Sequence, residues 1–217
     1  MSGCCARHGQ EQLFGDRFAK RAARRYRRKG PDAMARSLAR RAAAGGLEGA
    51  TVLEIGGGIG QVLLGLLEAG AREGEVVELV PSYESHAREL ADEAGLGERA
   101  AFRTADLVAD PTARREADIV VLNKVVCCTP DGVELAGIAA SLARRTLVLS
   151  FPRDVWWTRF FLAVGNGFMR ARRRSFRAFV HSPQALQRAA EEHGLTLASE
   201  RDGPLFRIAA FERAYPS

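Results

Sequence analysis

The segment Thr51–Gly70, TVLEIGGGIGQVLLGLLEAG, constrains the fold of this chain more than any other. It reads as a buried strand, a glycine-rich turn and an amphipathic helix. Gly56, Gly58 and Gly60 allow a sharp turn and let a ligand lie against main-chain N–H groups without a Cβ in the way. A G-x-G-x-G turn alone is a weak indicator of a ligand site, because a tight strand-to-helix turn needs the same glycines.

After Gly46 the sequence alternates short β-branched runs with longer helical patterns, which is typical of βαβ units. We therefore expect an α/β fold: one seven-stranded, mostly parallel sheet with helices on both faces and an N-terminal helical cap. Strands are expected at residues 51–55, 75–80, 101–104, 118–122, 145–151, 195–200 and 205–211, and helices at 61–69, 82–94, 131–143, 154–169 and 182–193.

The first 46 residues are expected to form a cap or lid, ahead of a ligand-binding domain at 47–217 that carries an insertion at about 153–181. In the cap, residues 11–29 are amphipathic and predict one helix. Asp32 can start a second helix that runs to about Ala44. The following Gly45-Gly46 provides a hinge for a closing lid.

The net charge of +6 is concentrated in this cap. Residues 1–50 hold 12 Lys or Arg against 4 Asp or Glu, a net of +8, whereas the other 167 residues hold 20 against 22, a net of −2. Such a segment fits a nucleic-acid arm, an anionic membrane surface or the solvated face of a helix. We expect weak membrane-surface contact through the basic helix. No nucleic-acid partner is expected, because the second basic run, RARRRSFR, lacks the interleaved aromatic residues of single-strand binders.

Composition and cysteine usage narrow the class of protein further. Hydrophobic residues make up 47% of the 217 residues and charged residues 27%, which suits one globular core and excludes intrinsic disorder. Neither a signal-peptide pattern nor an apolar run of ~18 residues is found, so a cytoplasmic protein is expected.

The cysteines form two adjacent pairs, Cys4-Cys5 and Cys127-Cys128. We expect free thiols and no metal, the alternative being a soft-metal site that joins both pairs with His8.

Two acidic residues follow the strands next to the glycine turn. Glu78 ends the second strand, 78 − 60 = 18 residues after the last glycine, where a carboxylate can accept both hydroxyl protons of an adenosine ribose. Asp106 follows the third strand, where it can hold an adenine amino group. Because the carboxyl ends of parallel strands meet at one edge of the sheet, the sequence predicts a nucleoside-shaped crevice at that edge.

The E-x-G-x-G-x-G run that starts at Glu54, read together with Glu78 and Asp106, resembles the motifs of class I S-adenosylmethionine-dependent methyltransferases. A dinucleotide dehydrogenase has G-x-G-x-x-G, and here Gln61 stands in place of the last glycine of that pattern. The resemblance implies a Rossmann-like class I methyltransferase fold and S-adenosylmethionine as cofactor. It places Glu54 near the methionine moiety and adds Asn123, after the fourth strand, to the cofactor-binding residues.

A narrower resemblance runs almost from end to end. The motifs are Phe14-Gly15 and Arg25-Tyr26 before the sheet, VVCCTPD after the fourth strand, LSFPRD after the fifth, and then SFRAFVH. In this order they are similar to magnesium-protoporphyrin O-methyltransferases. Where that family carries a His just before Tyr-Pro, this chain has Cys128-Thr129-Pro130.

In this fold the methyl acceptor lies between the cap, the loop after strand four and the insertion. His181 is the candidate general base, and Tyr26 and Cys128 are the other candidate catalytic residues; each of the three can equally be an ordinary core or surface residue. His86 and His193 are expected on helix surfaces. The aromatic face of the insertion helix either packs the cap onto the sheet or supports a flat apolar acceptor.

The prediction is therefore an S-adenosylmethionine-dependent enzyme that methylates a small, apolar or aromatic molecule, most readily at a carboxylate or hydroxyl oxygen. Two alternatives remain open. One is an RNA methyltransferase that uses the basic N-terminal segment, and the other is a non-catalytic module that binds S-adenosylmethionine.

Overall fold

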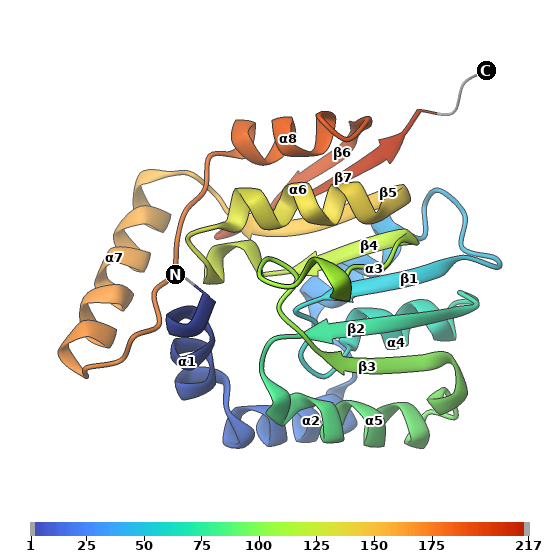
Figure 1. Cartoon of the computed structure of the whole chain (residues 1–217), viewed down its shortest axis with the longest axis horizontal. Coiled ribbons are helices and arrows are strands. Elements are labelled where there is room, and N and C mark those ends of the chain that lie inside the picture. The colour runs from blue at the N-terminus through green and yellow to red at the C-terminus, as the bar shows by residue number, and fades with distance from the viewer. Residues whose placement is uncertain (1–2, 215–217) are drawn as a thin grey trace.

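The computed structural model describes residues 3–214, with side chains described from Gly9 onward. Its centre is a seven-stranded sheet in the order β3-β2-β1-β4-β5-β7-β6 (Figure 1). The strands run parallel except β7, which lies antiparallel between β5 and β6. Their bounds are β1 Thr51–Ile55, β2 Glu73–Glu78, β3 Ala100–Thr104, β4 Ala117–Asn123, β5 Ala143–Pro152, β6 Leu195–Asp202 and β7 Phe206–Arg213.

Helices cover both faces of this sheet. The helices of the described residues are α1 Gly3–Phe14, α2 Asp16–Lys29, α3 Ala33–Ala42, α4 Gln61–Glu68, α5 Glu84–Glu93, α6 Gly132–Leu142, α7 Trp156–Ala171 and α8 Pro183–Glu191. One buried cluster joins α3, α4 and α5 to the sheet, and the other joins α6 and α8 to its opposite face (Figure 1). The predicted Rossmann-like α/β fold with a seven-stranded, mostly parallel sheet is confirmed.

Strand β1 shows how alternation along the chain builds the two cores. Val52 belongs to the cluster with α3, α4 and α5, whereas Leu53 and Ile55 belong to the cluster with α6 and α8. Because successive side chains point to opposite faces, Glu54 lies on the same side as Val52, and it is only 1% exposed. A carboxyl group is thus placed inside the core, directly beside the glycine turn.

The N-terminal region contains one more helix than predicted. The single helix expected over residues 11–29 is wrong, because α1 and α2 are separated at Gly15. Gly15 is the extended N-cap of α2, and its carbonyl accepts the N–H groups of Phe18 and Ala19. A Cβ at this position would lie 2.9 Å from the carbonyl oxygen of Glu11, so the break occurs where a side chain would not fit.

Helix α3 begins as predicted and packs into the core. Asp32 is its N-cap, with Oδ1 accepting the N–H of Ala35 at 2.8 Å. The helix ends at Ala42, two residues before the expected end, and Leu38 is fully buried in the cluster that contains α4 and β1. Any movement of the cap is therefore easier for the helices that precede α3.

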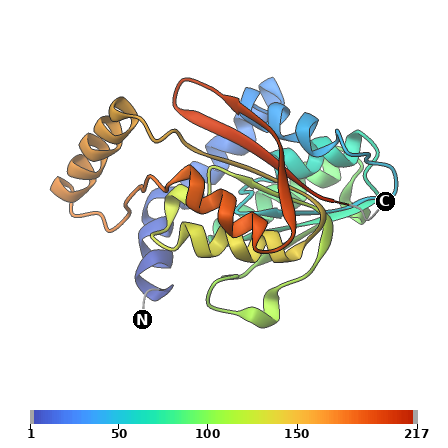
Figure 2. The same ribbon diagram turned by 90° about the horizontal axis from the view of Figure 1, so that it is seen from above.

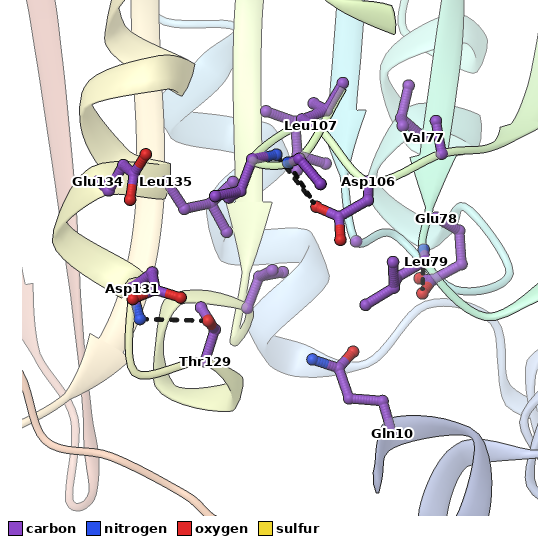
Figure 3. A pocket seen from close by; sticks show the side chains of 16 residues that line it. Gln10, Val77, Glu78, Leu79, Asp106, Leu107, Thr129, Asp131, Glu134 and Leu135 are labelled. Carbon is purple, nitrogen blue, oxygen red and sulfur yellow. Dashed lines mark hydrogen bonds between the residues drawn. The ribbon is translucent and has the colours of Figure 1, made fainter. Parts of the chain in front are cut away.

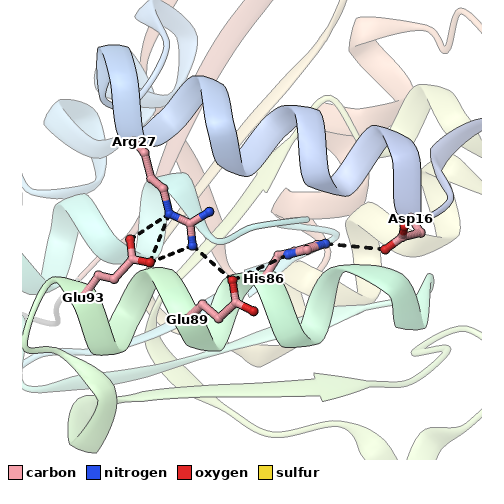
Figure 4. A network of polar contacts seen from close by, with 5 residues as sticks. All are labelled: Asp16, Arg27, His86, Glu89 and Glu93. Carbon is pink, nitrogen blue, oxygen red and sulfur yellow. Dashed lines mark hydrogen bonds and ion pairs between the residues drawn. The ribbon is translucent and has the colours of Figure 1, made fainter.

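Helix α2 packs against α5 through small buried residues and a surface network of charges (Figure 4). Ala19 and Ala23 are buried in the contact. The Arg27 guanidinium forms a bidentate ion pair with Glu93, with Nε–Oε2 at 2.8 Å and Nη2–Oε1 at 2.7 Å. Its Nη2 also donates to Glu89 Oε2 at 3.0 Å. Since these charges are exposed, their main effect is to orient α2 and not to stabilise the fold.

His86 lies between the same two helices. Its Nε2 is 3.5 Å from Asp16 Oδ1, its Nδ1 is 3.8 Å from Glu89 Oε2, and 16% of its side chain is exposed. The expectation that His86 lies on a helix surface is therefore wrong, because a helix packed above it covers the ring (Figure 4). His193 is exposed, as expected.

Helix α7 projects from the body of the protein (Figures 1 and 2). Of its residues only Thr158 is buried, so the alternative in which its aromatic face packs the cap onto the sheet is wrong. Amphipathicity in the sequence identified the apolar face but not whether anything covers it. Within residues 3–214, none of the helices combines the length and apolarity needed to cross a membrane.

Candidate cofactor and acceptor site

A cavity of about 390 Å³ lies at the carboxyl ends of β1, β2, β3 and β4 (Figure 3). Strand β1 has β2 on one side and β4 on the other, so the cavity lies at the topological switch point, where open α/β sheets bind ligands. Its volume is in the usual range for small-molecule sites. The lining residues are Gln10, Ile55, Gly56, Val77, Glu78, Leu79, Ala105, Asp106, Leu107, Val108, Ala109, Val125, Thr129, Asp131, Glu134 and Leu135.

Glu78 lines this cavity from the end of β2, as the sequence predicts. Its Oε1 accepts the N–H groups of Leu79 and Val80 at 2.8 and 3.1 Å, and its Oε2 accepts the N–H of Gly58 at 2.8 Å. Burial raises the pKa of Glu78, although the three N–H groups act in the opposite direction. A carboxylate offers about four acceptor positions. One position therefore remains open, and accepting both ribose hydroxyls requires one of the backbone bonds to open.

Asp106 lines the cavity from the loop after β3. Its Oδ1 accepts the N–H groups of Val108 and Ala109 at 3.1 and 3.2 Å, which fixes the loop as a turn around this carboxylate (Figure 3). Within the described residues, Oδ2 accepts no hydrogen bond. One oxygen thus holds the loop while the other is available to a ligand amino group.

The cavity is acidic although the protein is basic. Four of its lining residues carry carboxyl groups, and no described lining residue is a Lys, Arg or His: the acids are Glu78, Asp106, Asp131 and Glu134. This lining favours a ligand with positive charge, such as the sulfonium and ammonium groups of S-adenosylmethionine. It disfavours a pyrophosphate, which a nicotinamide dinucleotide would bring. The residues present therefore fit the cofactor that the resemblance implies.

The glycine turn adopts the left-handed backbone that its sequence predicts. Gly56, Gly58 and Gly60 have φ of 64°, 57° and 74°. Gly56 also lines the cavity, and a Cβ there would lie 2.6 Å from Cγ2 of Val125, which lines the cavity from the loop after β4. Gly58 and Gly60 are not lining residues; they shape the turn that presents the Gly58 N–H to Glu78.

Glu54 is placed behind the turn and does not line the cavity. Its Oε2 accepts the N–H of Leu63 at 2.8 Å, in the first turn of α4. Burial raises the pKa of Glu54 to about 8, against the opposing effect of the N–H groups of Leu63 and Val62. This carboxyl therefore caps α4 from inside the core. It also occupies donors that a dinucleotide pyrophosphate would otherwise use.

The end of β4 is held by side-chain hydrogen bonds. Asn123 does not line the cavity; its Oδ1 accepts the Ser150 hydroxyl at 3.3 Å, and the Ser150 Oγ accepts the N–H of Lys124 at 2.9 Å. Lys124 has φ of 61°, a left-handed conformation that is strained for a non-glycine residue. These contacts aim the following residue, Val125, into the cavity.

Gln10 is a cavity residue that the sequence interpretation missed. It lies on α1, and its Nε2 donates to the Cys128 carbonyl at 3.2 Å, so it joins the cap to the loop after β4. A polar residue within a helix that also carries Leu13 and Phe14 gave no local signal. Only the packing of α1 over the sheet edge brings it to the cavity.

His181 holds the loop after β4 through hydrogen bonds to two of its carbonyl groups. Its Nε2 lies 2.9 Å from the Val126 carbonyl and 3.1 Å from the Thr129 carbonyl, so this nitrogen carries the proton. The ring stacks on Phe179 with centroids 6.2 Å apart. Gly132 makes room for it, since a Cβ at Gly132 would lie 2.4 Å from Nε2. His181 does not line the cavity.

This geometry gives a testable role for His181 as a positioning residue. We expect His181→Ala to lose about 1–3 kcal/mol of stability, from two hydrogen bonds, and to lower turnover by a similar factor at every pH. His181→Gln, whose amide can donate to the same carbonyls, should recover part of both. Melting temperatures and a pH–rate profile measure these effects. If His181→Ala instead abolishes one limb of the pH–rate profile, the residue is a general base.

The other two candidate catalytic residues also lie outside the cavity lining. Burial raises the pKa of Tyr26 to about 12, and the charges of Glu68 and Glu54 add to the effect. The Cys128 thiol donates to the Lys124 carbonyl at 3.3 Å, and its hydrogen bond with Cys127 and its burial raise its pKa. At neutral pH both groups therefore keep their protons.

The thiols form no metal site within the described residues. No group of three or more His, Cys, Asp or Glu there is arranged to hold a metal ion. Cys127 is buried and Cys128 half-buried, and both thiols are free. The alternative that joins them to Cys4, Cys5 and His8 depends on side chains outside the described residues.

Comparison with known proteins supports the interpretation of the cavity as a cofactor site. A family profile described as "Methyltransferase domain" matches residues 24–200, most of the chain. No curated protein sequence matches the chain significantly.

Solved structures share the fold at low sequence identity. Magnesium protoporphyrin IX methyltransferase from Synechocystis PCC 6803, crystallised with bound S-adenosylhomocysteine, superposes with a TM-score of 0.71 at 22% identity, over 94% of this chain and 100% of that one. An O-methyltransferase family protein from Burkholderia thailandensis gives 0.72 at 21% identity, over 96% and 64% of the two chains. An O-methyltransferase family 2 protein from Planctomyces limnophilus DSM 3776, in complex with apigenin, gives 0.68 at 18%, over 94% and 64%. The chain belongs to the methyltransferase-domain family, and the predicted enzyme class and S-adenosylmethionine cofactor are confirmed.

Proposed function

We propose that this enzyme methylates an oxygen atom of a small apolar or aromatic molecule. The observation that carries the proposal is the cavity itself, which combines a set of carboxyl groups with an apolar wall at the switch point of the sheet. The wall includes Leu79, Leu107, Val125 and Leu135. The shared fold with two proteins described as O-methyltransferases supports the choice of oxygen.

The cofactor, when bound, supplies an electrophilic methyl group on a sulfonium. In this proposal the open acceptor position of Glu78 receives a ribose hydroxyl, and Oδ2 of Asp106 receives the adenine amino group. Gly56 lets the ligand approach the main chain closely. The remaining task of the protein is to hold the acceptor oxygen in line with the methyl group, about 3 Å away, and to exclude water.

We propose a carboxylate as the acceptor group. His181 donates its Nε2 proton to carbonyls, and Tyr26 and Cys128 have raised pKa values, so none of the three is arranged as a base at neutral pH. A phenol or alcohol needs a base to remove its proton, whereas a carboxylate is already ionised at pH 7. An ionised acceptor needs no base from these three residues, and the positive sulfonium of the bound cofactor offsets its repulsion from the acidic lining.

Incubation of the purified protein with methyl-labelled S-adenosylmethionine and a cell extract tests the proposal. The expected product is a labelled small molecule that releases methanol on mild alkaline hydrolysis, which identifies a methyl ester. Label that becomes acid-precipitable and RNase-sensitive would favour an RNA methyltransferase instead. Binding of the cofactor without any consumption would favour a non-catalytic module.

The N-terminal cap, residues 1–46, is proposed to act as a lid through its segment at 11–44. Gln10 of α1, next to this segment, contacts the loop after β4 at the cavity wall. We expect amide hydrogen exchange in α1 and α2 to slow several-fold when saturating S-adenosylhomocysteine is bound. Helix α8, none of whose residues line the cavity, serves as the internal control. Unchanged protection of the cap at saturation would contradict the lid.

A further inference from the structure

One face of α7 is an apolar surface exposed to solvent. Side chains spaced three and four residues apart share one side of a helix. On α7 five such side chains are each between 52% and 74% exposed: Trp156, Phe160, Phe161, Val164 and Phe168. Exposed large apolar groups at this density mark an interaction site and not an ordinary protein surface. We call this stripe the α7 surface.

The helix presents this surface rigidly. Its opposite face is anchored by Asn166, whose Nδ2 donates to the Ala178 carbonyl and whose Oδ1 accepts the Ala178 N–H, both at 2.8 Å. Thr158 is buried on the same anchored side. The Trp157 Nε1 donates to the Pro204 carbonyl at 3.5 Å, at the start of the helix. The aromatic groups therefore face outward because the other side of α7 is fixed to the protein.

Exposed arginines lie next to the α7 surface, at the C-terminal end of the helix. Arg170, Arg172 and Arg173 are exposed, and none of them forms an ion pair with an acidic residue in the described part of the chain. The Arg172 guanidinium lies 4.4 Å from the centroid of the Phe168 ring, so charge and apolar surface are contiguous. By contrast, Arg159 on the anchored side is neutralised by Asp154.

We propose that the α7 surface binds the interface of an anionic membrane. A helix with aromatic residues on one face and arginines beside them lies in the plane of the headgroups, with its rings in the acyl region and its cations on the phosphates. A second copy of the chain is a poorer occupant. A two-fold contact through α7 would cover these unpaired arginines without an anionic partner, because α7 contains no acidic residue.

The position of the α7 surface relates it to the cavity. Both lie at the carboxyl end of the parallel strands (Figure 1). The segment that follows α7 contacts α1, with the rings of Phe176 and Phe14 at 5.3 Å and Arg174 Nη1 donating to the Gln12 carbonyl at 2.6 Å. Docking would thus place the cap and the cavity next to the bilayer. The membrane proposal itself does not depend on which acceptor is methylated.

Tryptophan fluorescence tests the proposal directly, because the chain has two tryptophans, Trp156 and Trp157, and both lie in α7. The full-length protein is mixed with vesicles of phosphatidylcholine alone or with about 30% phosphatidylglycerol. We expect co-sedimentation and a blue shift with the anionic vesicles, both reduced by salt. Brominated lipid chains should quench the emission.

Matched variants identify the surface that binds. Phe160→Ser with Phe161→Ser, and separately Arg170→Gln with Arg172→Gln, should each weaken vesicle binding about tenfold or more. The apolar control is Leu197→Ser, which replaces an exposed residue of β6. The charge control is Arg24→Gln with Arg28→Gln, on the basic helix α2. Both controls should bind as the unmodified protein does, and all variants should keep their affinity for S-adenosylhomocysteine.

Three results would overturn the proposal. One is the absence of binding to anionic vesicles by the unmodified protein. Another is loss of binding in the α2 control but not in the α7 variants, which would assign the membrane contact to the basic N-terminal helix. The third is a lipid-free dimer in sedimentation velocity that the Phe160→Ser, Phe161→Ser variant dissociates, which would make a second copy the occupant.

Discussion

Replacing Glu78 with alanine is expected to weaken the binding of S-adenosylmethionine by roughly ten- to a hundredfold. A hydrogen bond to a charged acceptor contributes about 1.5–3 kcal/mol, and each 1.4 kcal/mol is tenfold in affinity. The change also removes the acceptor for the N–H groups of Gly58, Leu79 and Val80, so the glycine turn and the end of β2 lose these hydrogen bonds. Calorimetric titration of the purified variant measures the loss.

A control on the same strand separates this effect from general damage to β2. Glu73 lies at the other end of β2, is exposed and pairs with Arg72 on the surface. Glu73→Ala should bind the cofactor as the unmodified protein does. Glu78→Ala that unfolds at the same temperature as the Glu73 variant, and still binds the cofactor normally, would remove Glu78 from the site. A lowered melting temperature with weakened binding would show both of its roles.

The strands and the cavity residues at their ends could be predicted because they depend on local pattern. Seven β-branched runs gave seven strands within a few residues of their observed bounds. Glu78, Asp106 and Gly56 line the cavity as expected, because the carboxyl end of a parallel strand determines which edge of the sheet a following residue reaches.

The catalytic candidates were less predictable, because they depend on contacts between distant segments. The orientation of His181 follows from Gly132 and two carbonyls 52 and 55 residues earlier in the chain. No spacing rule predicts that geometry. In the same way, Gln10 reaches the cavity only because α1 turns at Gly15 and lies over the loop after β4.

Glu54 illustrates an intermediate case. In the structure, the alternation of β1 places it on the face opposite Leu53 and Ile55, toward α4. The resemblance placed it near the methionine moiety of the cofactor, and the structure brings its carboxyl to the N–H of Leu63. Its contact with a bound cofactor stays a prediction, whereas its role in capping α4 is part of the fold.

The burial of Glu54 leads to the second prediction, a strong dependence of the free energy of unfolding on pH. Its pKa is raised to about 8, so between about pH 4.5 and 8 the folded protein holds a proton that the unfolded chain has lost. The free energy of unfolding therefore falls as pH rises through this window. Each pH unit lowers the free energy of unfolding by about 1.4 kcal/mol, so the decrease over the whole window is about 4–5 kcal/mol. This stabilisation is fully present below about pH 4.5 and is lost as the pH approaches 8.

We expect Glu54→Gln to abolish this dependence. The amide oxygen can accept the Leu63 N–H as the carboxyl does, and it has no proton to lose. Relative to the unmodified protein, the variant should therefore gain several kcal/mol of unfolding free energy on going from pH 5 to pH 8. Urea unfolding at both pH values measures the difference, and Glu98→Gln on the surface is the control.

The direction in which the relative stability of the Glu54→Gln variant changes with pH shows whether Glu54 is protonated or ionised at neutral pH. A buried carboxyl that is protonated at neutral pH makes the glutamine variant relatively more stable at high pH. An ionised Glu54, stabilised by the first turn of α4, would make the variant relatively less stable there, because the substitution would remove a favourable charge at a helix N-terminus. The first outcome means that the start of α4 is capped by a neutral carboxyl group of the chain itself, which occupies the Leu63 N–H that an anionic ligand would otherwise use.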